Sequence, residues 1–133
     1  MSAAGGNRPT HAPFVPRRVD KPWGSELIWA LTDRYCGKLI TIEAGRRLSL
    51  QYHEQKDESI LVTTGRLRLH LQDDAGAMTV RELGPGDAAH VAVGRRHRFE
   101  AIERVELIEV STPELADVVR VEDDFGREGT SAP

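Results

Sequence analysis

The feature that most limits the fold of this chain is a series of short apolar or alternating segments, each ended by Gly, Pro or Asp. The clearest is Arg66–Gln72, where three leucines alternate with polar residues. Because successive side chains of a strand point to opposite faces, these leucines predict one buried face. Turn residues follow at 73–76 and 84–87. This rhythm is typical of an all-β sandwich or barrel.

Nine strands are predicted from this pattern. They are Glu26–Ala30, Cys36–Ile42, Arg47–Tyr52, Glu58–Thr63, Arg66–Gln72, Met78–Leu83, Ala88–Val91, Arg98–Ile102 and Val105–Ser111. A short C-terminal helix is predicted over Thr112–Val118, because Thr112 can cap a helix and Pro113 suits its first turn.

The length of 133 residues predicts one domain with one hydrophobic core. Residues 1–18 are rich in Gly, Pro and Ala with little apolar periodicity, which indicates a flexible N-terminal arm. Residues 19–125 are expected to form the folded domain. Residues 126–133 are expected to be a frayed tail.

The composition argues against several kinds of partner. The chain has 18 Lys and Arg against 21 Asp and Glu, and a net charge of −3 gives no general attraction to nucleic acid or to an anionic membrane. The single Cys36 cannot form an intramolecular disulfide, and no apolar run reaches the roughly 20 residues that span a bilayer. The first residues also lack the apolar segment of a secretion signal, so a cytoplasmic location is expected.

Four residues with suitable donor atoms suggest a metal site. Gln51 and His53 share one face of a predicted strand, Glu58 opens the next strand after a polar turn, and His97 follows a second turn. Two imidazoles, one carboxylate and one amide oxygen suit one divalent ion, with zinc expected and manganese or ferrous iron as alternatives. The competing interpretation is that His53 and His97 are unrelated core or surface histidines.

These residues fall within strings that resemble the cupin superfamily. The first cupin motif is resembled by Gly45-Arg46-Arg47-Leu48-Ser49-Leu50-Gln51-Tyr52-His53 with Glu58 and Gly65, and the second by Gly86-Asp87, Gly94 and His97. Within the cupins, the chain is most similar to the isomerase domain of type II mannose-6-phosphate isomerases. That likeness is carried by Lys21-Pro22-Trp23-Gly24-Ser25, Arg47 to His53, Val93-Gly94, His97-Arg98, Glu106 to Val110, Val119-Arg120, Glu122-Asp123 and Gly126-Arg127.

The resemblance implies a small single-domain cupin, that is, a double-stranded β-helix or jelly-roll barrel. It also implies that Gln51 binds zinc where many cupins have a first histidine, and that two copies pair as a homodimer through their N-terminal strands. The chain departs from the family at several positions: Glu54 and Gln55 replace frequent histidines, Lys56 replaces Arg, Ala92 replaces Pro and Phe125 replaces Tyr.

The resemblance further implies an aldose–ketose isomerase for a sugar phosphate of the mannose-6-phosphate and fructose-6-phosphate type. A metal ion with one anionic ligand can stabilise the oxyanion of an enediol intermediate. Arg98 and Arg127 match family positions and are the preferred phosphate ligands. Other cations that suit this role are Arg47, Lys56, Arg96 and Arg120. Lys56 and Glu109 are candidates for the general base.

Two other functions remain open from the sequence. The chain could be a non-catalytic cupin that binds or senses a sugar or a small carboxylate, because fold does not decide function. An iron dioxygenase is a weaker alternative, since those cupins usually present more imidazole ligands. His11, His70 and His90 are expected not to bind the metal, and Trp23 and Trp29 are expected to be packing residues.

Overall fold

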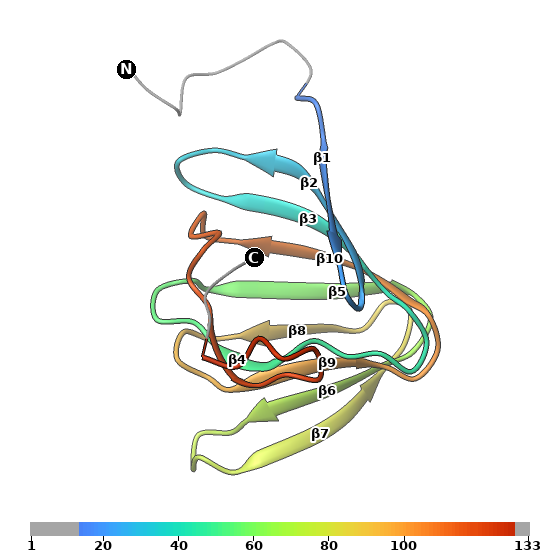
Figure 1. Ribbon diagram of the computed structural model, residues 1–133, viewed down its shortest axis with the longest axis vertical. Helices are drawn as coiled ribbons and strands as arrows, with labels where there is room; N and C mark the ends of the chain where they lie inside the picture. The colour runs from blue at the N-terminus through green and yellow to red at the C-terminus, as the bar shows by residue number, and fades with distance from the viewer. Residues whose placement is uncertain (1–13, 130–133) are drawn as a thin grey trace.

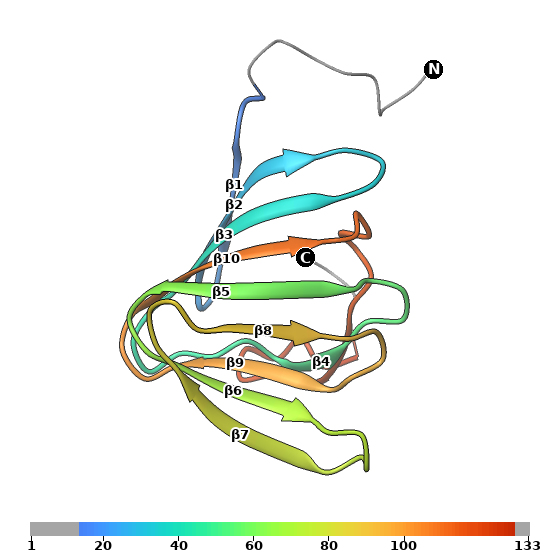
Figure 2. The ribbon, with the colours of Figure 1, turned by 180° about the vertical axis from the view of Figure 1, so that it is seen from behind.

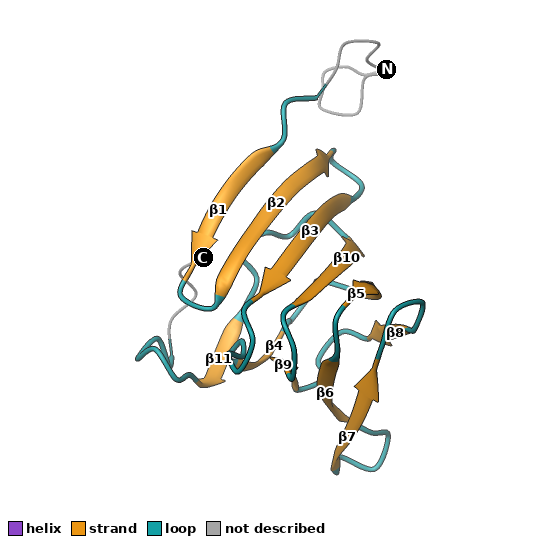
Figure 3. Ribbon diagram, turned by 90° about the vertical axis from the view of Figure 1, so that its right-hand side faces the viewer, coloured by secondary structure: helices purple, strands orange, loops and turns teal. Residues whose placement is uncertain are grey.

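The computed structural model describes residues 14–129, and within them the chain forms strands and no helix (Figure 3). The strands are β1 (Arg17–Lys21), β2 (Gly24–Leu31), β3 (Cys36–Ile42), β4 (Leu50–Tyr52), β5 (Glu58–Thr64), β6 (Leu67–Gln72), β7 (Met78–Leu83), β8 (Ala88–Val91), β9 (His97–Ala101), β10 (Val105–Ser111) and β11 (Val119–Glu122). Figure 1 labels β1 to β10, and Figure 3 labels β11 as well. All nine predicted strands are present with small shifts of their ends.

The strands build two antiparallel sheets that face each other, as Figures 1 and 2 show from opposite sides. One sheet has the order β1-β2-β3-β10-β5-β8, and the other has the order β11-β4-β9-β6-β7. Strands distant in sequence are therefore neighbours, such as β3 and β10. This arrangement confirms the predicted small all-β jelly-roll domain.

The hydrophobic core lies between the two sheets. The predicted alternation of β6 is confirmed, since Leu67 and Leu69 are buried and Leu71 packs against the same cluster. Phe99 on β9 and Ile40 on β3 reach this core from opposite sheets. Burial of these side chains, worth about 1.5–3 kcal/mol each, holds the two sheets together.

The predicted helix over Thr112–Val118 is wrong, because the segment is an irregular loop. The Thr112 hydroxyl oxygen accepts the backbone N–H of Asp57 at 3.0 Å instead of capping a helix. The Asp117 carboxylate likewise accepts backbone N–H groups of the 54–56 turn. The side chains of Thr112 and Asp117, which the predicted helix would include, are therefore hydrogen-bonded to the 54–57 turn instead.

Two strands were not predicted. β1 begins at Arg17, inside the predicted arm, and β11 follows directly after the 112–118 loop. Both are short and polar, and each exists through pairing with a neighbour, β1 with β2 and β11 with β4. The predicted domain boundaries remain predictions, and residues 1–13 and 130–133 lie outside the described residues. Among residues 14–129, no helix is long and apolar enough to cross a membrane.

Candidate metal centre

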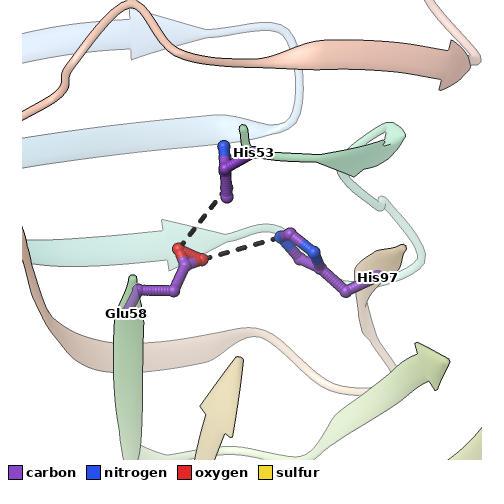
Figure 4. Close-up of side chains that lie close together, drawn as sticks. All are labelled: His53, Glu58 and His97. Atoms are coloured by element: carbon purple, nitrogen blue, oxygen red, sulfur yellow. Dashed lines mark ion pairs between the residues drawn. The ribbon is translucent and has the colours of Figure 1, made fainter. Parts of the chain in front are cut away.

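Three buried side chains converge inside the barrel, as Figure 4 shows. His53 follows β4, Glu58 opens β5 and His97 opens β9. The Glu58 carboxylate lies between the two rings, with Oε2 3.7 Å from Nε2 of His53 and Oε1 3.6 Å from Nε2 of His97. Candidate ligand atoms of the three residues all lie within 4.8 Å of one another. The barrel thus brings together residues from three strand ends.

Both imidazole rings are oriented by hydrogen bonds to backbone carbonyls. Nδ1 of His53 lies 2.5 Å from the carbonyl oxygen of Asp117, and Nδ1 of His97 lies 2.9 Å from that of Arg95. A carbonyl only accepts, so each Nδ1 carries the proton, and a neutral ring then has its lone pair on Nε2. Burial lowers the pKa of His97, which favours the neutral ring.

Two ring nitrogens that face the centre are buried and lack hydrogen-bond partners within residues 14–129. They are Nε2 of His53 and Nε2 of His97, while Oε2 of Glu58 meets the ammonium of Lys56 at 3.4 Å. Buried polar atoms are nearly always bonded, so two unpartnered imidazole nitrogens aimed at one carboxylate fit a cation site. Burial would raise the pKa of Glu58, but the neighbouring Lys56 charge, with His53 and His97, outweighs it and lowers that pKa, so the carboxylate is ionised.

Gln51 lies beside this group on the same face of the sheet. It is the direct cross-strand partner of His97, and cross-strand partners project to the same side. Its Oε1 accepts the hydroxyl hydrogen of Ser49 at 2.6 Å, and its side chain lines a cavity together with His53. Its role as a fourth ligand remains a prediction.

Lys56 and Glu109 form a buried ion pair next to the centre. Nζ of Lys56 lies 3.0 Å from Oε2 of Glu109 and 3.4 Å from Oε2 of Glu58. Burial lowers the pKa of Lys56, but the charges of Glu109 and Glu58 outweigh it and raise the pKa above its ordinary value. Burial, reinforced by the Glu58 charge, raises the pKa of Glu109. At neutral pH Lys56 is therefore a cation.

A cavity of about 200 Å³ opens beside the three candidate metal ligands, and His53 forms part of its wall. Its wall includes apolar side chains such as Trp23, Ile28 and Leu48. Its charged lining is Arg17, Lys21, Lys38, Lys56, Arg120 and Arg127, with Glu26 as the acidic residue. Lys38 pairs with Glu26, Lys56 with Glu58 and Glu109, and Arg127 with Asp123, so the six cations of the lining still outnumber these four carboxylates. This lining suits an anionic ligand of small size.

Sequence reasoning missed three of these cations: Arg17, Lys21 and Lys38. The first two lie on β1, which was not predicted. Lys38 had a readable signal, because it alternates with Cys36 and Ile40 on the inward face of a predicted strand. A lysine in an apolar row indicates either a buried ion pair or a site.

The two preferred phosphate ligands lie in different places. Arg127 lines the cavity, and the carboxylate of Asp123 holds its guanidinium with contacts of 2.8 and 3.0 Å. Arg98 does not line the cavity, and its guanidinium donates to the backbone carbonyls of Leu48 at 2.8 Å and Glu122 at 3.3 Å. Of this pair, Arg127 is placed to meet a ligand in the cavity.

The remaining predicted cations and histidines contact residues outside the three converging side chains. Arg47 pairs with Asp124, and Arg96 lies over the ring of Tyr52. His70 contacts Glu100, and His90 contacts Asp57. Neither histidine belongs to the candidate metal group found among residues 14–129, and His11 lies outside the described residues.

Comparisons with known proteins place the chain among mannose-1-phosphate guanylyltransferase and xanthan biosynthesis relatives by sequence. Mannose-1-phosphate guanylyltransferase ManC of Salmonella typhimurium is 33% identical over 122 residues, covering 88% of this chain and 24% of that protein. Xanthan biosynthesis protein XanB of Xanthomonas campestris is 30% identical over 116 residues, covering 84% and 24%. The chain therefore spans about a quarter of the length of these relatives.

Solved structures show the same fold. KdgF from Halomonas superposes with a TM-score of 0.64 at 23% identity, covering 73% of this chain and 87% of that one. Oxalate decarboxylase from Bacillus subtilis superposes with a TM-score of 0.71 at 16% identity, covering 80% and 30%. Residues 9–123 match the family described as mannose-6-phosphate isomerase C-terminal. The chain therefore belongs to the mannose-6-phosphate isomerase C-terminal family and is a cupin domain.

Proposed function

We propose that this protein is a metal-dependent aldose–ketose isomerase for a sugar phosphate of the mannose-6-phosphate and fructose-6-phosphate type. One observation carries the proposal: two unpartnered imidazole nitrogens and the Glu58 carboxylate converge beside a cavity lined by more cationic than acidic side chains. Such a site can hold a metal and an anionic substrate side by side. The relationship to mannose-1-phosphate guanylyltransferases adds a link to phosphorylated mannose.

His53, Glu58 and His97, with Gln51 as the fourth ligand, would hold one divalent ion. Zinc is the expected ion, and manganese and ferrous iron suit the same donors. The Bacillus subtilis oxalate decarboxylase has Mn(II) centres in the same fold. When bound, the ion would supply positive charge to an oxyanion that develops on the sugar.

The chain's own charged groups would orient the sugar and move its proton. We assign the phosphate to Arg127, with Arg120 and Lys21 as neighbours on the cavity wall. Arg98 would act less directly, by holding the backbone of Leu48 and Glu122. Lys56 lines the cavity and would first pass one ammonium proton to Glu109 behind it. Its neutral amine would then take the proton from the carbon next to the sugar carbonyl and return it to the carbonyl carbon.

A second candidate function is a non-catalytic cupin that binds or senses a sugar phosphate or a small carboxylate. The two ion pairs of Lys56 favour it, because an amine held at 3.0 Å by Glu109 and at 3.4 Å by Glu58 is retained as an ammonium, which cannot remove a proton from carbon. In that case the site would bind a ligand without exchanging its protons.

Metal analysis combined with an isomerase assay separates these functions. Purified protein should contain about one divalent ion per chain and should interconvert an aldose phosphate and a ketose phosphate, tested across hexose and pentose phosphates. In deuterated water the product should gain solvent deuterium at the carbon next to the carbonyl. Tight binding of a sugar phosphate without isotope exchange would support the binding protein and overturn the isomerase.

We also propose a homodimer formed through the outer face of the six-stranded sheet. This face carries six uncharged apolar side chains: Leu27, Trp29, Leu39, Leu61, Ile108 and Val110. Trp29, Leu61 and Val110 are exposed by 43%, 39% and 51%. Glu106 of β10 and Arg18 and Asp20 of β1 lie on the same face, so a second copy would pack against the apolar side chains between these charges.

A further inference from the structure

The 112–118 loop is bonded to the turn that carries one candidate metal ligand. One residue of this loop, Asp117, makes the contacts to four consecutive residues, 53 to 56. Its Oδ1 accepts the backbone N–H of Glu54 at 3.0 Å, and its Oδ2 accepts those of Gln55 at 2.7 Å and Lys56 at 2.8 Å. Its main-chain carbonyl accepts Nδ1–H of His53 at 2.5 Å.

We propose that Asp117 is the positioning residue of the metal centre. Its carbonyl holds His53 in the tautomer whose Nε2 lone pair faces Glu58, and its carboxylate holds the shape of the turn after His53. This inference rests on the proposed metal site. Asp117 would orient the His53 ring in that site and would not itself bind the metal. Groups that bond the outer nitrogen of a ligating histidine control ring orientation and basicity.

The arrangement links several parts of the site through one side chain. The turn held by Asp117 ends at Lys56, whose Nζ reaches Glu58. Directly after the loop, Val119 pairs with Tyr52, and Arg120 pairs with Gln51. The position of Asp117 therefore fixes the orientation of the His53 ring and the backbone position of Lys56 together. The strand that follows the loop, β11, pairs with β4, which ends next to His53.

If Asp117 served only to attach the loop to the turn, its replacement would change metal binding no more than the loss of another loop-to-turn hydrogen bond. Thr112 bonds the same loop to the same turn, since its Oγ1 accepts the backbone N–H of Asp57 at 3.0 Å, but it contacts no candidate ligand. Thr112→Ala is therefore a matched control for loop attachment. If Asp117 only anchored the loop, Asp117→Asn and Thr112→Ala would affect metal binding equally.

The test is titration of metal-free protein with Co²⁺, followed by its visible absorption, and competition for Zn²⁺ against a chromophoric chelator. Asp117→Asn should bind both ions about 10- to 100-fold more weakly than wild type, the usual effect of disturbing the surroundings of a metal ligand. It should also change the Co²⁺ spectrum. Thr112→Ala should keep the wild-type spectrum and affinity, and equal losses in both variants would overturn the inference.

A second measurement uses only the wild-type protein, so it tests the inference even if the Asp117→Asn variant does not fold. Proton–nitrogen NMR of the metal-free wild-type protein should show His53 as the Nδ1–H tautomer, and a ring protonated on Nε2 would overturn the inference. Wild-type protein that binds neither Co²⁺ nor Zn²⁺ would overturn both the metal site and the role of Asp117. Normal metal binding without isomerase activity would remove the proposed reaction and leave the Asp117 result standing.

Discussion

Lys56 and Glu109 lie inside the barrel with Nζ 3.0 Å from Oε2, and both side chains are almost completely buried. Removing one member leaves the other charge buried, so Lys56→Met or Glu109→Gln alone should reduce the free energy of unfolding by about 3–5 kcal/mol. The double variant should lose much less than the sum of the two. Urea denaturation of all four proteins measures this coupling, and additive losses would contradict a direct interaction.

Metal binding should depend on His97 and not on His90. His97→Ala removes one of the orphaned nitrogens, whereas His90 is exposed and contacts Asp57. Wild type and His90→Ala should each bind one divalent ion, and His97→Ala should bind none at micromolar metal. At 100 times the dissociation constant, zinc should stabilise the folded protein by about 2.7 kcal/mol. Thermal unfolding with and without a chelator measures this, and stabilisation of His97→Ala would contradict the assignment.

Phosphate recognition should depend on Arg127. Replacing Arg127 with Ala should weaken sugar-phosphate binding by about tenfold or more, the loss of at least 1.4 kcal/mol of charged contact. Binding of the unphosphorylated sugar should be unchanged. Arg104→Ala is the control, because Arg104 lies on the surface with Glu43 and Glu106. Calorimetry with both ligands measures the difference, and equal weakening of both would indicate a folding defect instead.

Acid should weaken the C-terminal segment through Asp123. The Arg127 hydrogen bonds lower the pKa of Asp123 below its ordinary value. A carboxyl with a lowered folded-state pKa contributes stability above its unfolded pKa of about 3.9, and this contribution is lost as pH falls through the folded pKa. Asp123→Asn should therefore reduce stability by about 1.5–3 kcal/mol at pH 7 and have much less effect near pH 2. Denaturation at both values tests this, and an equal loss at both would contradict it.

Self-association should depend on the outer face of the six-stranded sheet. Val110→Glu places a charge within the apolar surface and should give a monomer in sedimentation analysis. Val80→Glu is the matched control, because Val80 is exposed by 55% on β7 of the other sheet. It should keep the oligomeric state of wild type. A wild-type protein that is monomeric at high concentration would contradict the homodimer.

The strand pattern was readable because local alternation reports burial. The leucines of β6 indicated their inward face correctly. The false helix at Thr112–Val118 shows the limit of such reasoning. Thr112 and Asp117 are good helix-capping residues, yet both bond the distant 54–57 turn, and no local pattern reveals that choice.

The sequence by itself determined the all-β jelly-roll class and the donor types of the candidate metal centre, because strand periodicity and the spacing around His53 and His97 are local properties. Only the tertiary structure decided which charges share the barrel interior. Glu109 meets Lys56 across 53 positions of sequence, and Asp117 meets His53 across 64. Sheet pairing brings these residues together, and a long-range pairing has no signature in the chain between them.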